Sequence, residues 1–149
     1  MAQSRAARLA PVVEMAEAAE RSAAQRLGYF QGQVNLALNK LQELDQFRHD
    51  YQQQWLARGS GGVSGQWMMG YQRFLSQLDT AVAQQNKSLE WHQSNLDKAR
   101  TSWQEAYARV EGLRKLVQRY IDEARRLEDK REQKLLDELS QRLPRHEPD

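Results

Sequence analysis

Apolar residues recur at alternating steps of four and three from Tyr71 to Leu127, and this row constrains the fold more than any other feature. The alternation continues for about eight heptads, which is typical of the a and d positions of a coiled coil rather than the wider stripe of a globular helix. Only Gln85 and His92 are polar on this row, here called a seam, and Gly112 lies off it. The pattern predicts one very long helix that needs a partner helix.

A second seam covers residues 12–55 and repeats the same alternation. At Ala23 and Leu27 two steps of four follow one another, a stutter that locally unwinds a supercoil. Small residues before this point predict close, weak packing. Gly28 and Gly32 each lower helix stability by about 1 kcal/mol, so this half is the softer one.

A glycine-rich stretch, residues 58–65, separates the two seams. Four glycines in this stretch are incompatible with a continuous helix, and Gly59 is placed to end the first helix. Ser64 is suited to cap the second helix. The stretch lacks the lysine of a phosphate-binding loop, which favours a plain turn between helices over a nucleotide site.

The predicted fold is all-α: a long antiparallel two-helix coiled-coil hairpin with an overhanging C-terminal helix. We expect residues 1–149 to form a single coiled-coil rod, with helix one at about 9–57 and Pro11 in its first turn. Helix two is expected at about 66–143, followed by a disordered tail at 144–149.

The two seams meet in phase across the turn. Pairing Trp55 with Tyr71 places every a position opposite a d position, as an antiparallel coiled coil requires. The same register sets Ala23 opposite Trp103, a small residue against the largest one. Helix one then ends opposite about Ile121, so about 20 residues of helix two should overhang by roughly 30 Å.

Composition excludes several classes of protein. Charged residues are 28%, apolar residues 40% and mean hydropathy is −0.89, as expected of long solvated helices. The absence of cysteine excludes disulfides and fits a reducing cytoplasm. No apolar run approaches the roughly 18 residues that span a bilayer. The N-terminus does not resemble a signal peptide. A net charge of +2 is too small to imply nucleic acid.

No arrangement of residues indicates catalysis, a cofactor or a metal ion. His49, His92 and His146 are scattered and form no metal-binding motif. His92 is interpreted as a tolerated polar core residue. A two-helix rod also has no cleft from which water is excluded, so we expect a protein that is not an enzyme.

Basic residues gather toward the end of helix two: Arg114, Lys115, Arg119, Arg125, Arg126, Lys130, Arg131 and Lys134. A row of this kind is able to follow nucleic-acid phosphates. Acidic residues alternate with it, however, a pattern that favours a solvated face of salt bridges.

Near the turn, the g positions of both helices share one edge of the pair and are apolar there. The predicted patch, here called the turn patch, consists of Leu44, Phe47, Tyr51, Phe74, Leu78 and Ala81. Because two helices cannot fully bury phenylalanines at g, we interpret this patch as a partner-docking site. The alternative is that these rings only thicken a thin core.

Three segments of the chain resemble the FliJ family of bacterial flagellar protein export. The first is Leu44–Tyr51, an aromatic stretch before the turn, and the second is Gln66–Leu75, the entry into helix two. The third is Glu132–Glu138, which resembles a C-terminal Glu-x-Lys-x-x-Asp-Glu signature. Phe47 stands where the family pattern leads us to expect Tyr, and Gln85 where it leads us to expect His.

This resemblance implies a non-catalytic component that couples the export ATPase FliI to the export-gate membrane protein FlhA and interacts with export chaperones. Its location would be cytoplasmic, at the inner membrane of the flagellar base, with a role in motility and chemotaxis. The turn patch would meet the gate. The ATPase would meet basic residues of helix two: Arg114, Arg119, Arg125, Arg126, Lys130, Arg131 and Lys134.

Two other classes stay open from the residues alone. One is a generic coiled-coil adaptor, and the other is a basic helical protein that binds nucleic acid. Salt-sensitive binding to DNA or RNA would favour the second class.

Overall fold

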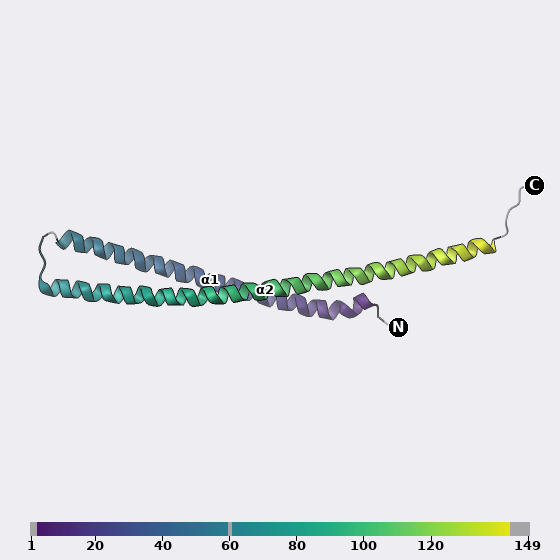
Figure 1. The fold of residues 1–149 in the computed structure, drawn as a ribbon, viewed down its shortest axis with the longest axis horizontal. Coiled ribbons are helices and arrows are strands. Elements are labelled where there is room, and N and C mark those ends of the chain that lie inside the picture. The colour runs from purple at the N-terminus through teal and green to yellow at the C-terminus, as the bar shows by residue number, and fades with distance from the viewer. Residues whose placement is uncertain (1–2, 60, 144–149) are drawn as a thin grey trace, which may run out of the picture. The chain divides into compact units, whose positions relative to one another are not determined.

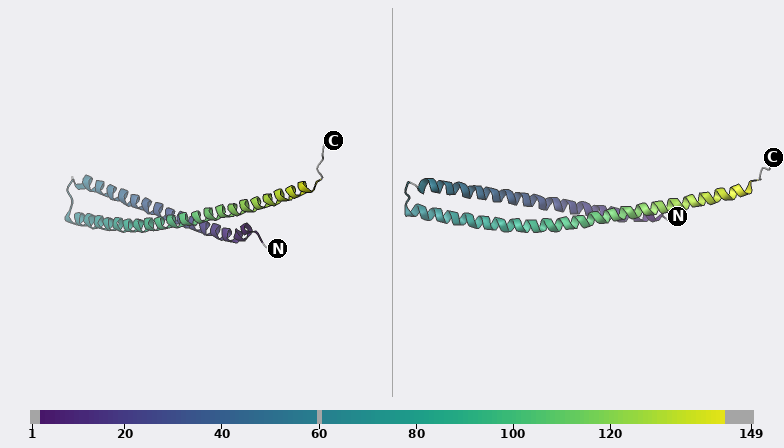
Figure 2. Two further views of the ribbon diagram at one scale, coloured as in Figure 1. Left: turned by 45° about the vertical axis from the view of Figure 1, so that its right-hand side comes forward. Right: turned by 45° about the horizontal axis from the view of Figure 1, so that its top comes forward.

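The computed structural model describes residues 3–59 and 61–143, which contain two α-helices. Helix α1 spans Arg5–Gly59 and helix α2 spans Gly65–Arg142. The helices pack against each other in opposite directions across the turn (Figures 1 and 2). The predicted all-α helical hairpin is therefore confirmed, whereas the tail predicted at 144–149 lies outside the described residues.

Helix α1 begins earlier than the sequence pattern suggested. The Ser4 Oγ accepts a hydrogen bond from the Ala7 N–H at 3.1 Å, and the Ser4 carbonyl accepts one from the Arg8 N–H at 3.0 Å. Ser4 thus caps the helix at Arg5, and Pro11 lies inside the helix rather than in its first turn. The expected start near residue 9 is wrong because a serine cap upstream of the proline initiates the helix.

The turn between the helices follows the predicted capping. The Ser64 Oγ accepts a hydrogen bond from the Trp67 N–H at 3.2 Å, which caps α2 as expected. Gly62 has φ of 81°, a left-handed conformation that favours glycine. The Gly61 N–H donates to the Arg58 carbonyl at 3.1 Å. These local bonds reverse the chain between Gly59 and Gly65.

The chain divides into two compact units, each made from a part of α1 and a part of α2. Residues 21–104 form one unit, which we call the turn unit. Residues 1–20 and 105–149 form the other, which we call the terminal unit.

The buried core of both units lies on the predicted seams. The buried apolar side chains are Ala16, Val34, Ala37, Tyr71, Leu78, Leu96, Ala99 and Val110. Each of them occupies a predicted a or d position. Three predicted positions are exposed. Ala124 and Leu127 are exposed near the start of α1, and Ala19 is exposed whereas Glu20 beside it is half-buried. The stutter accounts for the shift at Ala19, since the two successive steps of four that begin there rotate the seam around α1.

The polar residues on the seams of the turn unit are accommodated differently. The Gln85 Nε2 donates a hydrogen bond to the Ala37 carbonyl of α1 at 3.2 Å. Arg48 forms ion pairs with Asp45 at 3.1 Å and with Asp79 of α2 at 3.3 Å. Among the described residues, the buried Nδ1 of His92 has no hydrogen-bond partner. Of Gln85, Arg48 and His92, only His92 therefore has a buried polar atom whose desolvation no hydrogen bond offsets.

Candidate interaction surfaces

Aromatic rings from both helices stack against one another beside the turn. The Trp55 ring centroid lies 4.7 Å from that of Trp67 and 4.2 Å from that of Tyr71. The Tyr71 ring is nearly parallel to that of Tyr51, with 5.1 Å between centroids. The predicted pairing of Trp55 with Tyr71 is therefore confirmed. The other pairing that fixes the register, Ala23 with Trp103, stays a prediction.

The stack continues into the turn patch, where two phenylalanines at equivalent g positions differ in exposure. Phe74 contacts Tyr51 at 4.4 Å and Phe47 at 5.9 Å between centroids, and it is half-buried. Phe47 covers one side of Phe74 and is itself 54% exposed. Phe47 is thus the aromatic side chain of the patch that a partner would reach first.

The remaining residues of the turn patch are less accessible. Leu78 is only 8% exposed and belongs to the core. Leu44, Tyr51 and Ala81 are half-buried. The structure therefore brings Phe47, Tyr51 and Phe74 into contact, and it places Leu78 where it supports the patch from below.

Sequence reasoning missed other exposed apolar side chains close to the turn. Leu56 is exposed near the end of α1, and Met68 and Met69 are exposed in the first turns of α2. Leu56 and Met69 both occupy b positions, which flank the opposite edge of the pair from Phe47. The signal was present in the sequence, because consecutive Trp67-Met68-Met69 are unusual in a solvated helical turn.

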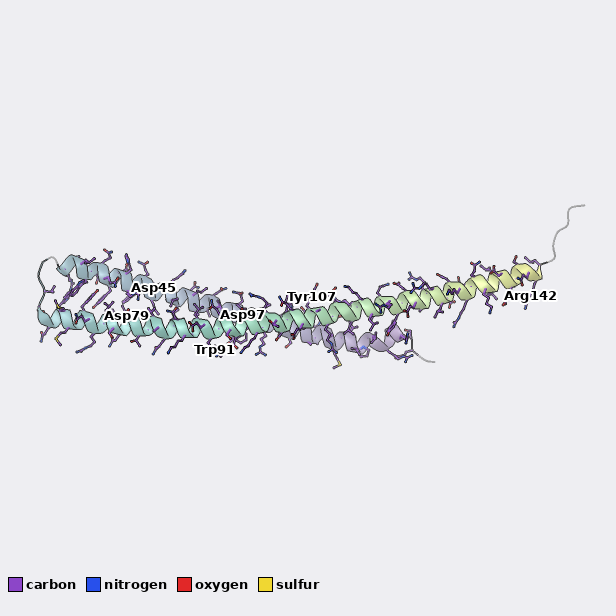
Figure 3. All side chains as sticks on the ribbon, viewed as in Figure 1. Asp45, Asp79, Trp91, Asp97, Tyr107 and Arg142 are labelled. Carbon is purple, nitrogen blue, oxygen red and sulfur yellow. The ribbon has the colours of Figure 1, made fainter. Side chains whose placement is uncertain are left out.

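In the terminal unit, α2 continues well beyond the start of α1. Arg5, the first residue of α1, lies over the ring of Tyr120, with its Cζ 4.9 Å from the ring centroid. This position agrees with the expected end of pairing near Ile121. Residues 122–142, here called the overhang, run past the start of α1 as far as Arg142 (Figure 3). Glu123, Ala124 and Leu127 still line a pocket with the first residues of α1, whereas residues 128–142 are all exposed.

The overhang exposes its apolar residues. Leu127, Leu135, Leu136 and Leu139 are each at least half exposed. Leu135, Leu136, Leu139 and Leu143 follow a spacing that brings them onto one face of the helix. An exposed leucine row on a helix without a partner helix is typical of a docking face.

The predicted basic residues differ in their pairing. Arg114 bonds to Glu111 at 3.2 Å and lies 3.7 Å from Glu17 of α1, so it ties the two helices of the terminal unit together. The other six are exposed, and within residues 61–143 none of them forms an ion pair: Arg119, Arg125, Arg126, Lys130, Arg131 and Lys134. The expected face of salt bridges is thus wrong for these six.

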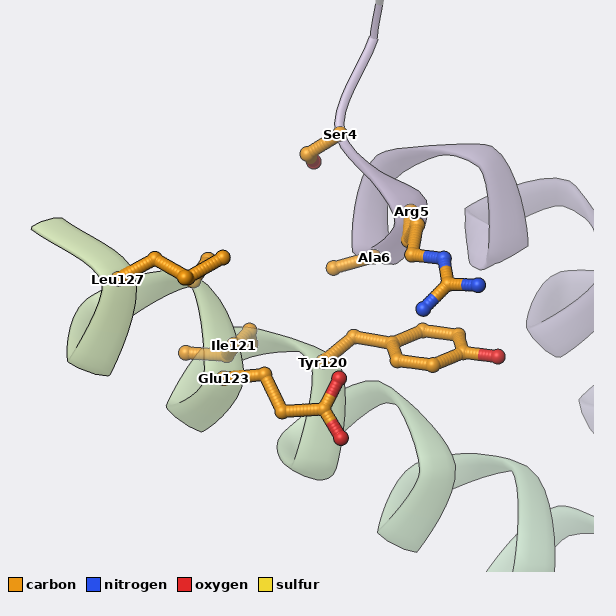
Figure 4. A pocket seen from close by; sticks show the side chains of 8 residues that line it. Ser4, Arg5, Ala6, Tyr120, Ile121, Glu123 and Leu127 are labelled. Carbon is orange, nitrogen blue, oxygen red and sulfur yellow. The ribbon is translucent and has the colours of Figure 1, made fainter.

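A pocket of about 380 Å³ lies where α1 begins (Figure 4). The Arg5 guanidinium and Ala6 form one side of it, and Tyr120, Ile121 and Leu127 form the other. A neighbouring hollow of about 270 Å³ shares Leu127 and is lined by Arg126 and Lys130. No pattern in the sequence predicted this pocket, since its position depends on where α1 starts.

Two features bear on chemistry and on membranes. Among the described residues, no group of three or more His, Cys, Asp or Glu side chains is arranged to hold a metal ion. Neither helix, over the part of the chain that is described, is long and apolar enough to cross a membrane.

The comparisons with known proteins identify the family. The family model described as flagellar FliJ protein matches residues 4–148. The chain belongs to the FliJ family. It is 27% identical over 141 residues to the flagellar FliJ protein of Escherichia coli (strain K12), which covers 95% of this chain and 96% of the relative. The resemblance based on the three segments is thus confirmed, and the FliJ match includes both candidate surfaces.

Proposed function

We propose that this FliJ-family protein is a non-catalytic component of the flagellar protein-export apparatus. It couples the export ATPase FliI to the export-gate protein FlhA and interacts with export chaperones. Its place is cytoplasmic, peripheral to the inner membrane at the flagellar base, and its loss is expected to abolish motility. Family membership supports the flagellar role.

The observation that carries the proposal is the overhang, a helical segment with exposed leucines and unpaired cations. Leucines on a solvated helix gain little free energy unless another surface buries them. Residues 128–142 have no partner helix within the described chain. We therefore assign the ATPase to this segment, together with the basic residues Arg119, Arg125, Arg126, Lys130, Arg131 and Lys134. Arg114 supports the same surface by holding α1 to α2.

The second surface is the turn patch, to which we assign the export gate. Phe47 is exposed beside half-buried Phe74, and aromatic side chains of this kind commonly anchor interfaces. Core residues such as Leu78 keep the rings in place. The two assignments are independent, because the residues belong to different units of the chain.

Binding of the ATPase is tested by removing leucines from the overhang without shortening it. The double substitution Leu135→Ser and Leu139→Ser should weaken ATPase binding by at least tenfold. The matched control, Gln133→Ser and Gln141→Ser, makes the same change in helix propensity on the opposite face and should bind as the wild type does. Both affinities are measured by titration calorimetry. Equal affinities for the two variants would contradict the assignment.

Binding of the gate is tested on the cytoplasmic part of FlhA. Phe47→Ala should lower affinity by about tenfold, equivalent to about 1.4 kcal/mol, because it removes an exposed aromatic anchor. Tyr29→Ala is the control, since Tyr29 is similarly exposed on α1 but lies outside the patch. Identical losses in both variants would argue against a specific site at Phe47. Salt-sensitive binding to DNA with no binding to FlhA or the ATPase would instead favour the nucleic-acid class.

A further inference from the structure

At the pocket beside the start of α1, the seam of α2 continues but the opposing seam of α1 does not. Tyr120, Ala124 and Leu127 continue the a and d positions of α2, but α1 begins at Arg5, so that only Ser4, Arg5 and Ala6 face the pocket from the side of α1. Leu127 is 58% exposed for this reason. In a coiled coil such positions form the holes that receive a side chain from a facing helix. The pocket therefore has the shape of an unfilled coiled-coil layer.

The size and the lining of the pocket suit an apolar group. A cavity of roughly 150 Å³ is enough to hold a benzene ring, and this pocket measures about 380 Å³. Ile121, Ala124 and Leu127 line it from α2. Arg5 and Ala6 lie on the side of α1 (Figure 4). A large apolar side chain from a partner would bury these groups.

The charges around the pocket are unbalanced. Arg126 and Lys130 line the neighbouring hollow and form no ion pair within residues 61–143. Arg5 adds a third cation at the mouth, where its guanidinium lies over Tyr120. Glu123 is the one carboxylate that lines either hollow. An occupant that carries carboxylates would complement this excess of positive charge.

We propose that the pocket binds an apolar side chain, flanked by carboxylates, on a helix of a partner protein. This helix takes the place that α1 leaves vacant along α2, with its apolar residue between Ala6 and Leu127 and its carboxylates toward Arg126 and Lys130. The inference rests on the proposed function in one respect, namely that the export ATPase supplies the helix.

The first test reverses the charge on one side of α2. Arg126→Glu combined with Lys130→Glu should weaken binding of the full-length protein to the ATPase by at least tenfold. The matched control is Lys87→Glu with Lys98→Glu, which changes the net charge equally but lies in the turn unit, outside the ATPase surface and both hollows. The control should lose less than about threefold, the part attributable to long-range attraction. Equal losses would overturn the proposal.

The second test fills the pocket. Ala124→Phe places a ring in the pocket, where it would exclude the apolar side chain of the partner helix, and should weaken ATPase binding about tenfold. Its melting temperature should match that of the wild type, because Ala124 is exposed and no core residue is removed. Unchanged ATPase binding by this variant would show that the pocket is not used. Self-association of the wild type that Ala124→Phe abolishes would assign the pocket to a second copy and also overturn the proposal.

A third measurement separates this inference from the proposed function. Two synthetic helical peptides are added to the wild-type protein, one with a central leucine flanked by glutamates and one with lysines in place of the glutamates. The methyl resonances of Ala6 and Ala124 should shift with the glutamate peptide only. If the ATPase fails to bind but these shifts occur, the proposed function is wrong and the pocket stands. If the ATPase binds and neither peptide shifts these methyls, the pocket assignment is wrong and the function stands.

Discussion

Leu78 and Leu96 in the turn unit are less than a tenth exposed, whereas Leu135 and Leu139 in the overhang are at least half exposed. All four lie on the same continuous helix, α2. The difference is the presence of α1, which covers the first pair and not the second. The overhang stays helical because it extends a helix that is already nucleated. Contacts such as the Gln118–Asp122 hydrogen bond at 3.0 Å support it locally.

This contrast indicates a division between stability and binding. In the turn unit, leucines and aromatic rings pack against the other helix, and this burial raises the free energy of unfolding. In the overhang, leucines contribute little to folding and are available to a partner. Substitutions of the same chemical kind should therefore have different consequences in the two regions.

The largest effect is expected for leucine truncation in the turn unit. Leu96→Ala should lower the free energy of unfolding by about 2–5 kcal/mol, since Leu96 is buried and its truncation leaves a cavity in the core. Leu139→Ala should change it by less than about 0.5 kcal/mol. Urea denaturation followed by circular dichroism measures both. Similar losses at the two leucines would remove the distinction between the regions.

Truncation within the aromatic stack should have the next largest effect. Trp55→Ala removes contacts with Trp67 and Tyr71 and should cost about 2 kcal/mol, below the usual value for a buried tryptophan because Trp55 is half-buried. The near-ultraviolet circular dichroism of the stacked rings should also collapse. Trp91→Ala, an exposed tryptophan of the same unit, is the control and should leave both readouts almost unchanged.

Two glycines in α1 offer a stabilising change in the turn unit. Gly28 and Gly32 are helical, and a Cβ added at either would meet no atom within 4 Å. Replacing each by alanine should raise the free energy of unfolding by about 0.5–1 kcal/mol, because alanine restricts the unfolded chain and favours helix. The melting temperature of the double variant measures the sum. A fall in melting temperature would contradict this prediction, because it would show that the added methyl groups are not accommodated at residues 28 and 32.

The smallest effect is expected for the exposed ion pairs of Arg48. Arg48→Ala removes contacts with Asp45 and Asp79, which are both more than one-third exposed, and should cost at most about 1 kcal/mol. The loss should shrink further at high salt, since exposed pairs are screened. A loss as large as that of Leu96→Ala would show that the seam depends on charge at this position.

The sequence predicted the core well because an a and d spacing determines which side of a long helix faces its partner. Leu78, Leu96 and Val110 are buried for that reason. It failed locally where the spacing is irregular, at Ala19 and Glu20, where the stutter begins. Regular seam spacing involves many residues, and together they determine the buried face. A stutter rotates that face by a fraction of a turn, and the size of the rotation depends on both helices.

The candidate sites were less predictable than the core. Phe47 and Phe74 share the g position, yet only Phe47 is mostly exposed, since the covering of one ring by another depends on side-chain rotamers. Arg114 belongs to an inter-helix ion pair with Glu17 that spacing alone did not indicate. The pocket beside Leu127 exists because Ser4 caps α1 where it does, a detail that the apolar pattern does not encode.

Native-state hydrogen exchange tests the central distinction most directly, on the protein alone and with the export ATPase. In the isolated protein, amides of residues 128–142 should exchange many-fold faster than those of residues 89–99, because no partner helix protects them. Added ATPase should slow exchange in residues 128–142 and leave residues 89–99 unchanged. Equal protection of the two segments in the isolated protein, or unaltered exchange of the overhang with saturating ATPase, would contradict this account.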